Sequence, residues 1–202
     1  MKNTIKLFIF LLAFIFSSNL NYGQELKSGD LKVLKGQTVI NLQYDYSNMA
    51  VGKYKSESEY VDKRTAEMNK EIAGSGDNWA MSWVNDRTSK FQPVFETKLN
   101  SKLSDDKVVA RENDLAAKYT LIVHTTFTEP GWNVGVSRDY AHINVEVSLV
   151  ESAAKDKPLA IISMENLKDI GGGFVFDTGS RIKTCYDRAG TNLGKFLVKN
   201  AF

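Results

Sequence analysis

Two histidines, His124 and His142, are the side chains of this chain best suited to acid–base chemistry or metal binding. Both fall on the polar side of neighbouring segments with alternating residues. One pairing register places His124 across from Glu146, and a two-residue shift places it across from Asn144. Imidazole and carboxylate groups suit zinc. A solvated polar sheet face explains the same pattern, because nothing in the sequence encloses these side chains, so we predict no metal and no cofactor.

The single cysteine, Cys185, falls on the apolar stripe of a predicted helix and has no evident base beside it. This context predicts a buried structural thiol rather than a nucleophile. One cysteine also excludes an intramolecular disulfide and a four-cysteine zinc site. Gly171 to Gly173 lacks the Lys and Ser or Thr that follow the last glycine of a phosphate-binding loop, which argues against nucleotide binding.

Acidic residues leave one catalytic hypothesis open. Pairs of carboxylates can act as acid and base in hydrolysis. The alternative function is therefore a hydrolase that uses acidic residues, or a histidine-bound metal, at the loop edge of the sheet. The acidic residues considered are Glu129, Asp139, Glu146, Glu165 and Asp177.

The connection from Glu129 to Tyr140 is long for a hairpin, and long loops with aromatic and charged tips often carry binding functions. The connection Gly171 to Phe176 is expected to emerge at the same edge of the sheet. We therefore predict a ligand-binding or partner-binding edge. The alternative is that Trp132 packs back onto the core and the glycines only form turns. The predicted binding residues are Trp132, Arg138, Tyr140, Phe174 and Phe176.

Trp79, Trp83 and Arg87 recur at four-residue steps on a predicted helix. Side chains at this spacing lie on one face and can stack on one another. A ridge of the hydrophobic core explains them better than a platform for a sugar.

Three strand-like segments are expected to position these residues: Tyr119 to Thr128, Ala141 to Glu151, and Leu159 to Leu167. In the middle segment, apolar residues alternate with polar ones, which is typical of a sheet buried on one face. The apolar positions are Ile143, Val145, Val147 and Leu149, and the polar positions are His142, Asn144, Glu146 and Ser148.

Helical patterns flank this meander. Ser56 to Glu59 matches a capping box, a second helix is expected from Asp77 or Asn78 with an interruption at Pro93, and Asp177 or Thr178 is expected to cap a last helix. Strands are predicted at Thr38 to Tyr46 and Lys107 to Arg111. This order predicts an α+β two-layer sandwich, with a mixed, mostly antiparallel sheet of about four to five strands and helices packed on one face. The small residues Ala189, Gly190 and Gly194 should bring the last helix close to the sheet.

The 202 residues, 43% of them hydrophobic and 25% charged, fit one domain, which we place at residues 38–202 after a flexible leader at 24–37. Met1 to Phe16 carries two lysines and then a short apolar run, the pattern of a secretory signal peptide. We place cleavage near Gly23, with a cut after Ser18 or an uncleaved anchor as alternatives. The mature chain would have no transmembrane segment. No cysteine is present for a lipid anchor, so we predict a periplasmic or secreted protein that is not a lipoprotein.

Charge argues against a nucleic-acid partner. Cleavage near Gly23 would remove Lys2 and Lys6 and no acidic residue, so the 26 basic residues of the full chain would fall to equal the 24 acidic ones. Partners such as nucleic acid and anionic membranes are usually met by a basic patch.

Three stretches resemble a group of uncharacterised secreted proteins of Gram-negative bacteria: Asp45 to Met49, Phe127 to Gly135, and Thr191 to Phe196. The element order is also similar to that of small α/β envelope-assembly domains, such as the N-terminal domain of the Tol-system β-propeller protein and the curli secretion lipoproteins. The resemblance implies export but no known activity and no functional residues.

These observations predict a non-enzymatic, envelope-associated binding or interaction module whose partner is an envelope protein or a small ligand. A third hypothesis is a homo-oligomer, formed through the polar sheet face or the strand Thr38 to Tyr46.

Overall fold

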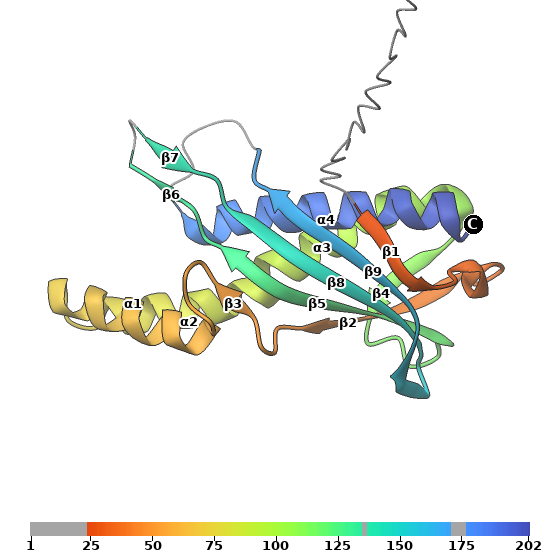
Figure 1. Cartoon of the computed structure of the whole chain (residues 1–202), viewed down its shortest axis with the longest axis horizontal. Helices are drawn as coiled ribbons and strands as arrows, with labels where there is room; N and C mark the ends of the chain where they lie inside the picture. Colours follow the sequence, from red (N-terminus) through yellow and green to blue (C-terminus); the bar gives the residue numbers. More distant parts are fainter. Residues whose placement is uncertain (1–23, 135–136, 171–176) are drawn as a thin grey trace, which may run out of the picture.

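The computed structural model describes residues 24–134, 137–170 and 177–202. The predicted signal peptide, Met1 to Gly23, and the predicted binding residues Phe174 and Phe176 lie outside the described residues. Within the described part, a mixed sheet packs against helices, so the α+β class predicted from the sequence is confirmed (Figure 1). No described helix has the length and apolar character needed to cross a membrane.

The main sheet has seven strands in the order β1-β9-β8-β5-β2-β4, with β3 pairing with β5 beyond the end of β2. The pairs β1/β9, β9/β8 and β8/β5 are antiparallel, whereas β2 runs parallel to both β5 and β4. One parallel pairing was predicted from the helices between the first strand and the meander. Because β3 also runs parallel to β5, the described sheet has as many parallel as antiparallel pairs and is not mostly antiparallel. The strands are β1 (Gln24–Gly29), β2 (Val39–Asp45), β3 (Ala50–Val51), β4 (Val109–Glu112), β5 (Tyr119–Glu129), β8 (His142–Glu151) and β9 (Ala154–Lys168).

The central meander agrees with its sequence pattern. All four apolar positions of β8 are buried, and His124 pairs with Glu146 in the first of the two predicted registers. Strand β2, which covers most of Thr38 to Tyr46, has β5 on one side and β4 on the other. The hypothesis that this strand pairs with a second copy is contradicted over most of its length, because β4 pairs with residues 39–42 and β5 with residues 41–45.

The N-terminal segment differs from the prediction of low local order. Gln24–Gly29 forms the edge strand β1 against β9, and the turn η1 (Lys32–Leu34) follows. Leu31 and Leu34 are buried in the core. The side chains of β1 are mostly exposed, so this strand is held by backbone pairing and carries no alternating apolar signal. It widens the sheet beyond the predicted strand number.

Local signals set the helix boundaries. The Ser56 hydroxyl accepts a hydrogen bond from the Glu59 amide at 3.3 Å, and the Asp177 carboxylate caps α4. Pro93 does not end the helix as expected, because a π-helical turn at Arg87–Phe91 directly precedes α3 and the chain stays helical across it. Helix α2 starts at Ser75, before the predicted Asp77. The helical segments are α1 (Glu57–Glu71), α2 (Ser75–Asp86), η2 (Arg87–Phe91), α3 (Gln92–Leu103), η3 (Ser104–Asp106) and α4 (Thr178–Asn200).

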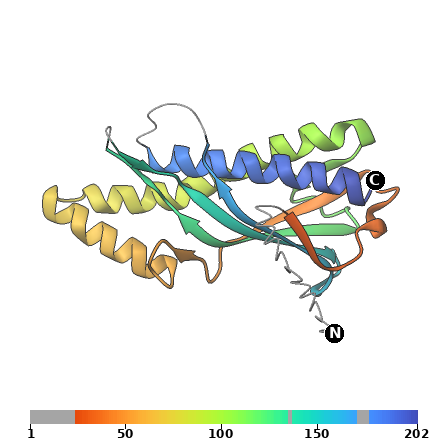
Figure 2. The same cartoon turned by 45° about the horizontal axis from the view of Figure 1, so that its top comes forward.

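Helices α3 and α4 lie side by side on one face of the sheet, and the α1–α2 pair projects past its end (Figures 1 and 2). The glycines of α4 serve a different contact from the one predicted. A Cβ atom at Gly190 would lie 2.3 Å from the carbonyl oxygen of Phe95, and one at Gly194 would lie 2.6 Å from Cβ of Lys102. These glycines bring α4 close to α3, not to the sheet.

Candidate functional site

The predicted binding loop is a small β-ribbon. Strands β6 (Trp132–Asn133) and β7 (Arg138–Asp139) pair antiparallel and extend the β5–β8 hairpin past the main sheet (Figure 1). Its apolar side chains remain in solvent, with exposed fractions of 45% for Trp132, 66% for Val134 and 38% for Tyr140. Trp132 therefore does not pack back onto the core.

A buried arginine fixes the base of this ribbon. Arg181, in the first turn of α4, is 6% exposed. Its Nε donates to the carbonyl oxygen of Pro130 at 3.2 Å, and its Nη2 donates to that of Gly131 at 3.1 Å. A guanidinium group presents several donors in a fixed plane, so it holds two successive carbonyls in a defined geometry. The ribbon is therefore anchored to α4.

The structure brings Arg138 and Tyr140 together. Nη2 of Arg138 donates to the Tyr140 hydroxyl at 2.6 Å, and the guanidinium lies 4.5 Å from the centre of the ring. Trp132 pairs with Asp139, whose neighbours Arg138 and Tyr140 point to the other side of the ribbon. The three described residues of the predicted edge therefore occupy both faces of one ribbon.

The two histidines have structural contacts. Nε2 of His124 donates to the carbonyl oxygen of Ser47 at 2.8 Å and ties the segment after β2 to β5. The ring of His142 packs on Phe127, with 5.4 Å between ring centres. Among the described residues, no group of three or more His, Cys, Asp or Glu side chains is placed to hold a metal. The geometry gives His124, His142 and Glu146 no shared coordination site.

The carboxylates at the loop edge also act as local hydrogen-bond acceptors. Glu129 accepts from the Gly131 amide, and Asp139 accepts from the Tyr140 amide. Asp177 caps α4 and pairs with Lys90 at 3.1 Å. Burial opposes ionisation of Asp177, but hydrogen bonds from Ser180 and the charge of Lys90 lower its pKa below the ordinary value. These contacts position the ribbon and the helix start.

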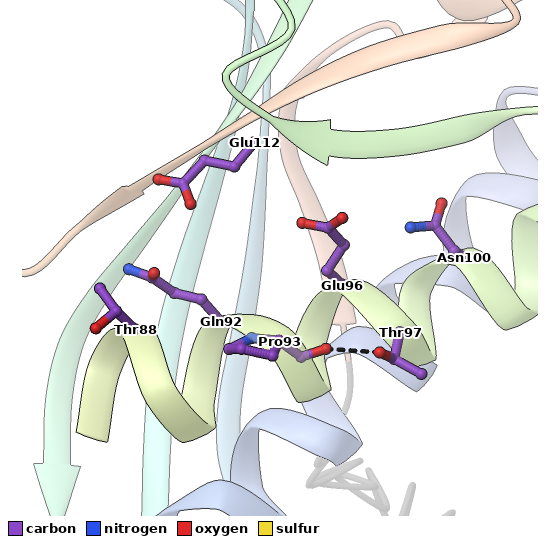
Figure 3. A pocket seen from close by; sticks show the side chains of 7 residues that line it. All are labelled: Thr88, Gln92, Pro93, Glu96, Thr97, Asn100 and Glu112. Atoms are coloured by element: carbon purple, nitrogen blue, oxygen red, sulfur yellow. Dashed lines mark hydrogen bonds between the residues drawn. The ribbon is translucent and has the colours of Figure 1, made fainter. Parts of the chain in front are cut away.

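A groove that the sequence did not indicate lies between α3 and β4 (Figure 3). It has a volume of about 350 Å³, and the carboxylates of Glu96 and Glu112 reach into it. Burial raises the pKa of Glu96, and the nearby charge of Glu112 adds to the rise. The lining residues are Thr88, Gln92, Pro93, Glu96, Thr97, Asn100 and Glu112.

One wall of this groove seals an edge of the sheet. The side-chain amide of Asn100 donates to the Ala110 carbonyl at 2.7 Å and accepts from the Ala110 amide at 2.8 Å. Asn100 thus replaces a neighbouring strand at the outer side of β4, which is the last strand of the sheet. The four-residue spacing of Glu96 and Asn100 beside the apolar stripe of α3 is the signal that could have located this wall. We assign the groove a structural role.

The tryptophan ridge and the cysteine are also structural. Trp83 is buried and its indole N–H donates to Glu57, which also pairs with Arg87. The ring of Tyr60 packs against both Trp79 and Trp83. These contacts confirm a core ridge at the base of the α1–α2 pair.

Cys185 is fully buried, as predicted. Burial raises the pKa of its thiol to about 12. Its Sγ donates to the carbonyl oxygen of Ala141 at 3.4 Å, so the thiol links α4 to the segment before β8. A thiol with so high a pKa is a poor nucleophile at neutral pH.

No protein-family model and no curated protein matches this chain. Among solved structures, it is similar to the PelC dodecamer from Paraburkholderia phytofirmans, with 10% identity, a TM-score of 0.40, and coverage of 84% of this chain and 96% of that one. Protein XCC0632 from Xanthomonas campestris has 8% identity, a TM-score of 0.32 and coverage of 80% and 83%. A neuraminyllactose-binding hemagglutinin homolog from Helicobacter pylori has 11% identity, a TM-score of 0.31 and coverage of 86% and 87%. Likeness at this level does not indicate what the chain does.

Proposed function

We propose that this chain is an exported, non-enzymatic protein of the bacterial periplasm or cell envelope that binds a partner through the β6–β7 ribbon. The expectation of export rests on the charged start and apolar run of Met1 to Phe16. The observation that carries the binding proposal is a ribbon that exposes Trp132 and Tyr140 while buried Arg181 holds its base.

Residue types on the ribbon fit a binding surface. Trp, Tyr and Arg are enriched among the residues that dominate binding energy at interfaces. Anchoring by Arg181 fixes the ribbon before the partner arrives, which lowers the entropy cost of ordering it on binding. An envelope protein or a small ligand with an apolar surface would be bound in this way.

The test is capture of the partner in the producing cells. The full chain is produced with its own signal peptide, and the envelope fractions are cross-linked. The amount of cross-linked complex that contains the protein is then compared between the natural chain and a Trp132→Ala, Tyr140→Ala double variant. We expect the double variant to lose the complex while keeping its unfolding midpoint.

Leu115→Ala is the matched control, because Leu115 is an apolar side chain with 96% exposure outside the ribbon. The control should form the complex at the natural level. Equal complex formation by the ribbon variant would refute the proposal. The hydrolase alternative gains no support from the loop-edge carboxylates, since Glu129, Asp139 and Asp177 accept structural hydrogen bonds.

A further inference from the structure

The C-terminal part of β9 has an open side. Gln24, the first described residue, pairs with Met164, whereas β9 continues to Lys168. Beyond Met164, β9 therefore has no neighbouring strand on that side within the described ranges. The Asp169 amide donates to Ala141 on the β8 side at 2.8 Å. Backbone groups alternate in direction along a strand, so those of Lys168 and Ile170 point to the open side.

A β-bulge shapes the strand just before this point. The register between β8 and β9 shifts between Val145↔Met164 and Ile143↔Leu167. Asn166 adopts a left-handed conformation with φ of 54°, and its amide donates to the side-chain oxygen of Asn144 at 2.8 Å. Bulges redirect the side chains that follow them and are common beside functional sites. Here the bulge sets the direction in which the side chains of Asn166, Lys168 and Ile170 leave the strand.

These three residues line a cavity of about 190 Å³ together with Arg188 of α4. Ile170 is 68% exposed beside it. In the part of the chain that the structure describes, neither Lys168 nor Arg188 forms an ion pair, and the acidic neighbour of Arg188, Asp187, pairs with Lys98 instead. Asp169 alternates to the buried side of the strand.

Within the described residues, two cations without acidic partners, an amide and an exposed apolar side chain thus lie beside a strand edge that has no neighbouring strand. Lysine alone on an edge strand serves to prevent aggregation. Arg188 comes from a different element, α4, and lines the same cavity, which that role does not require. Cationic side chains form strong charge-assisted hydrogen bonds with carboxylates.

We propose that this edge binds an extended acidic segment of a partner protein. The segment adds a strand beside Lys168 and Ile170, one of its carboxylates lies between Lys168 and Arg188, and an apolar neighbour packs on Ile170. The site shares no residue with the β6–β7 ribbon, so it goes beyond the proposed function and stands or falls independently of it.

The test uses the protein recovered from cells that produce the full chain. Its affinity is measured by fluorescence anisotropy for a labelled synthetic peptide of alternating Val and Asp, and for the matched peptide of Val and Asn. We expect the Asp peptide to bind, the Asn peptide to bind about tenfold more weakly, and a Lys168→Glu, Arg188→Glu double variant to lose the preference for Asp.

Lys183→Glu with Lys195→Glu is the control, because both lysines are exposed on α4 and the change in net charge is the same. The control should keep the preference. The proposal would be overturned if the control lost the preference equally or if both peptides bound equally well. It would also be overturned if the protein bound vesicles with anionic lipids through Lys168 and Arg188 in place of the peptide. A Trp132→Ala variant should bind the Asp peptide normally, which separates this site from the ribbon.

Discussion

Nε of Arg181, at the start of α4, donates a hydrogen bond to the carbonyl oxygen of Pro130, 51 residues earlier in the chain. This bond and its neighbour to Gly131 join the last helix to the base of the exposed ribbon. Because Arg181 is buried, neither carbonyl has solvent as an equal replacement.

Arg181→Leu should therefore free the ribbon and destabilise the fold. We expect a loss of about 2 to 4 kcal/mol in the free energy of unfolding, since the buried carbonyl of Pro130 and the partly buried carbonyl of Gly131 lose their donor. Urea unfolding measures the loss, and amide hydrogen exchange should show faster exchange from Gly131 to Tyr140. Arg188→Leu, on the same helix but without an ion pair in the described structure, should stay within about 0.5 kcal/mol of the natural chain. Unchanged exchange in the ribbon would show that Arg181 does not hold it.

The bidentate contact between Asn100 and Ala110 gives a second prediction. Asn100→Ala leaves both backbone groups of Ala110 without their partner, so we expect a loss of about 1 to 3 kcal/mol in urea unfolding. The opened edge of β4 should also increase self-association in sedimentation experiments. Thr97→Ala is the control, because Thr97 lines the same groove but bonds only to its own helix. Equal stability of the two variants would contradict the role assigned to Asn100.

The close contact between α3 and α4 gives a third prediction. Ala is favoured over Gly within helices by about 1 kcal/mol, so Gly190→Ala would stabilise a free helix. Here the added methyl group would meet the backbone oxygen of Phe95, which cannot move without shifting α3. We expect a net loss of about 1 to 3 kcal/mol in thermal unfolding. Lys195→Ala, at an exposed position of α4, should change stability by less than about 0.5 kcal/mol. A stabilised Gly190→Ala variant would place the helices further apart.

Sequence patterns predicted the elements in which buried residues recur at a regular spacing. The alternation in β8 comes from one face that packs on the core. Strand β1 escaped prediction because it is held by backbone pairing and exposes polar side chains. The period also could not show that Gly190 faces α3, since a helix pattern indicates burial but not the neighbour.

The site was predicted only in its outline. The length and composition of Glu129 to Tyr140 indicated a long connecting loop with a binding role but not its pairing into a ribbon, and Trp132 and Tyr140 are exposed. Its anchor was missed because a charged residue at a helix start is expected in solvent, whereas Arg181 is buried. Asn100 was missed for a related reason. Its four-residue spacing from Glu96 places it beside the apolar stripe of α3, but the sequence does not show that its side chain pairs with the backbone of Ala110.

The buried thiol of Cys185 predicts a pH dependence of stability. Its pKa is raised from an ordinary value of 9.0 to about 12, so between these values the folded chain retains a proton that the unfolded chain has lost. The folded state then binds more protons than the unfolded state, and stability falls as pH rises from about 9 to about 12. The thiol contributes its full effect below pH 9. The loss across the window is on the order of 4 kcal/mol.

Tyrosines and lysines titrate over the same range, so the thiol is isolated by comparison with Cys185→Ala. That variant is less stable at neutral pH because it leaves a small cavity, but its stability should fall less steeply between pH 9 and pH 12. Urea unfolding at several pH values gives both slopes. Alkylation by iodoacetamide provides an independent check, because the native thiol should stay unmodified at pH 8 and react once the chain unfolds. Parallel slopes for the two chains, or rapid alkylation of the native protein, would mean that Cys185 is accessible to solvent.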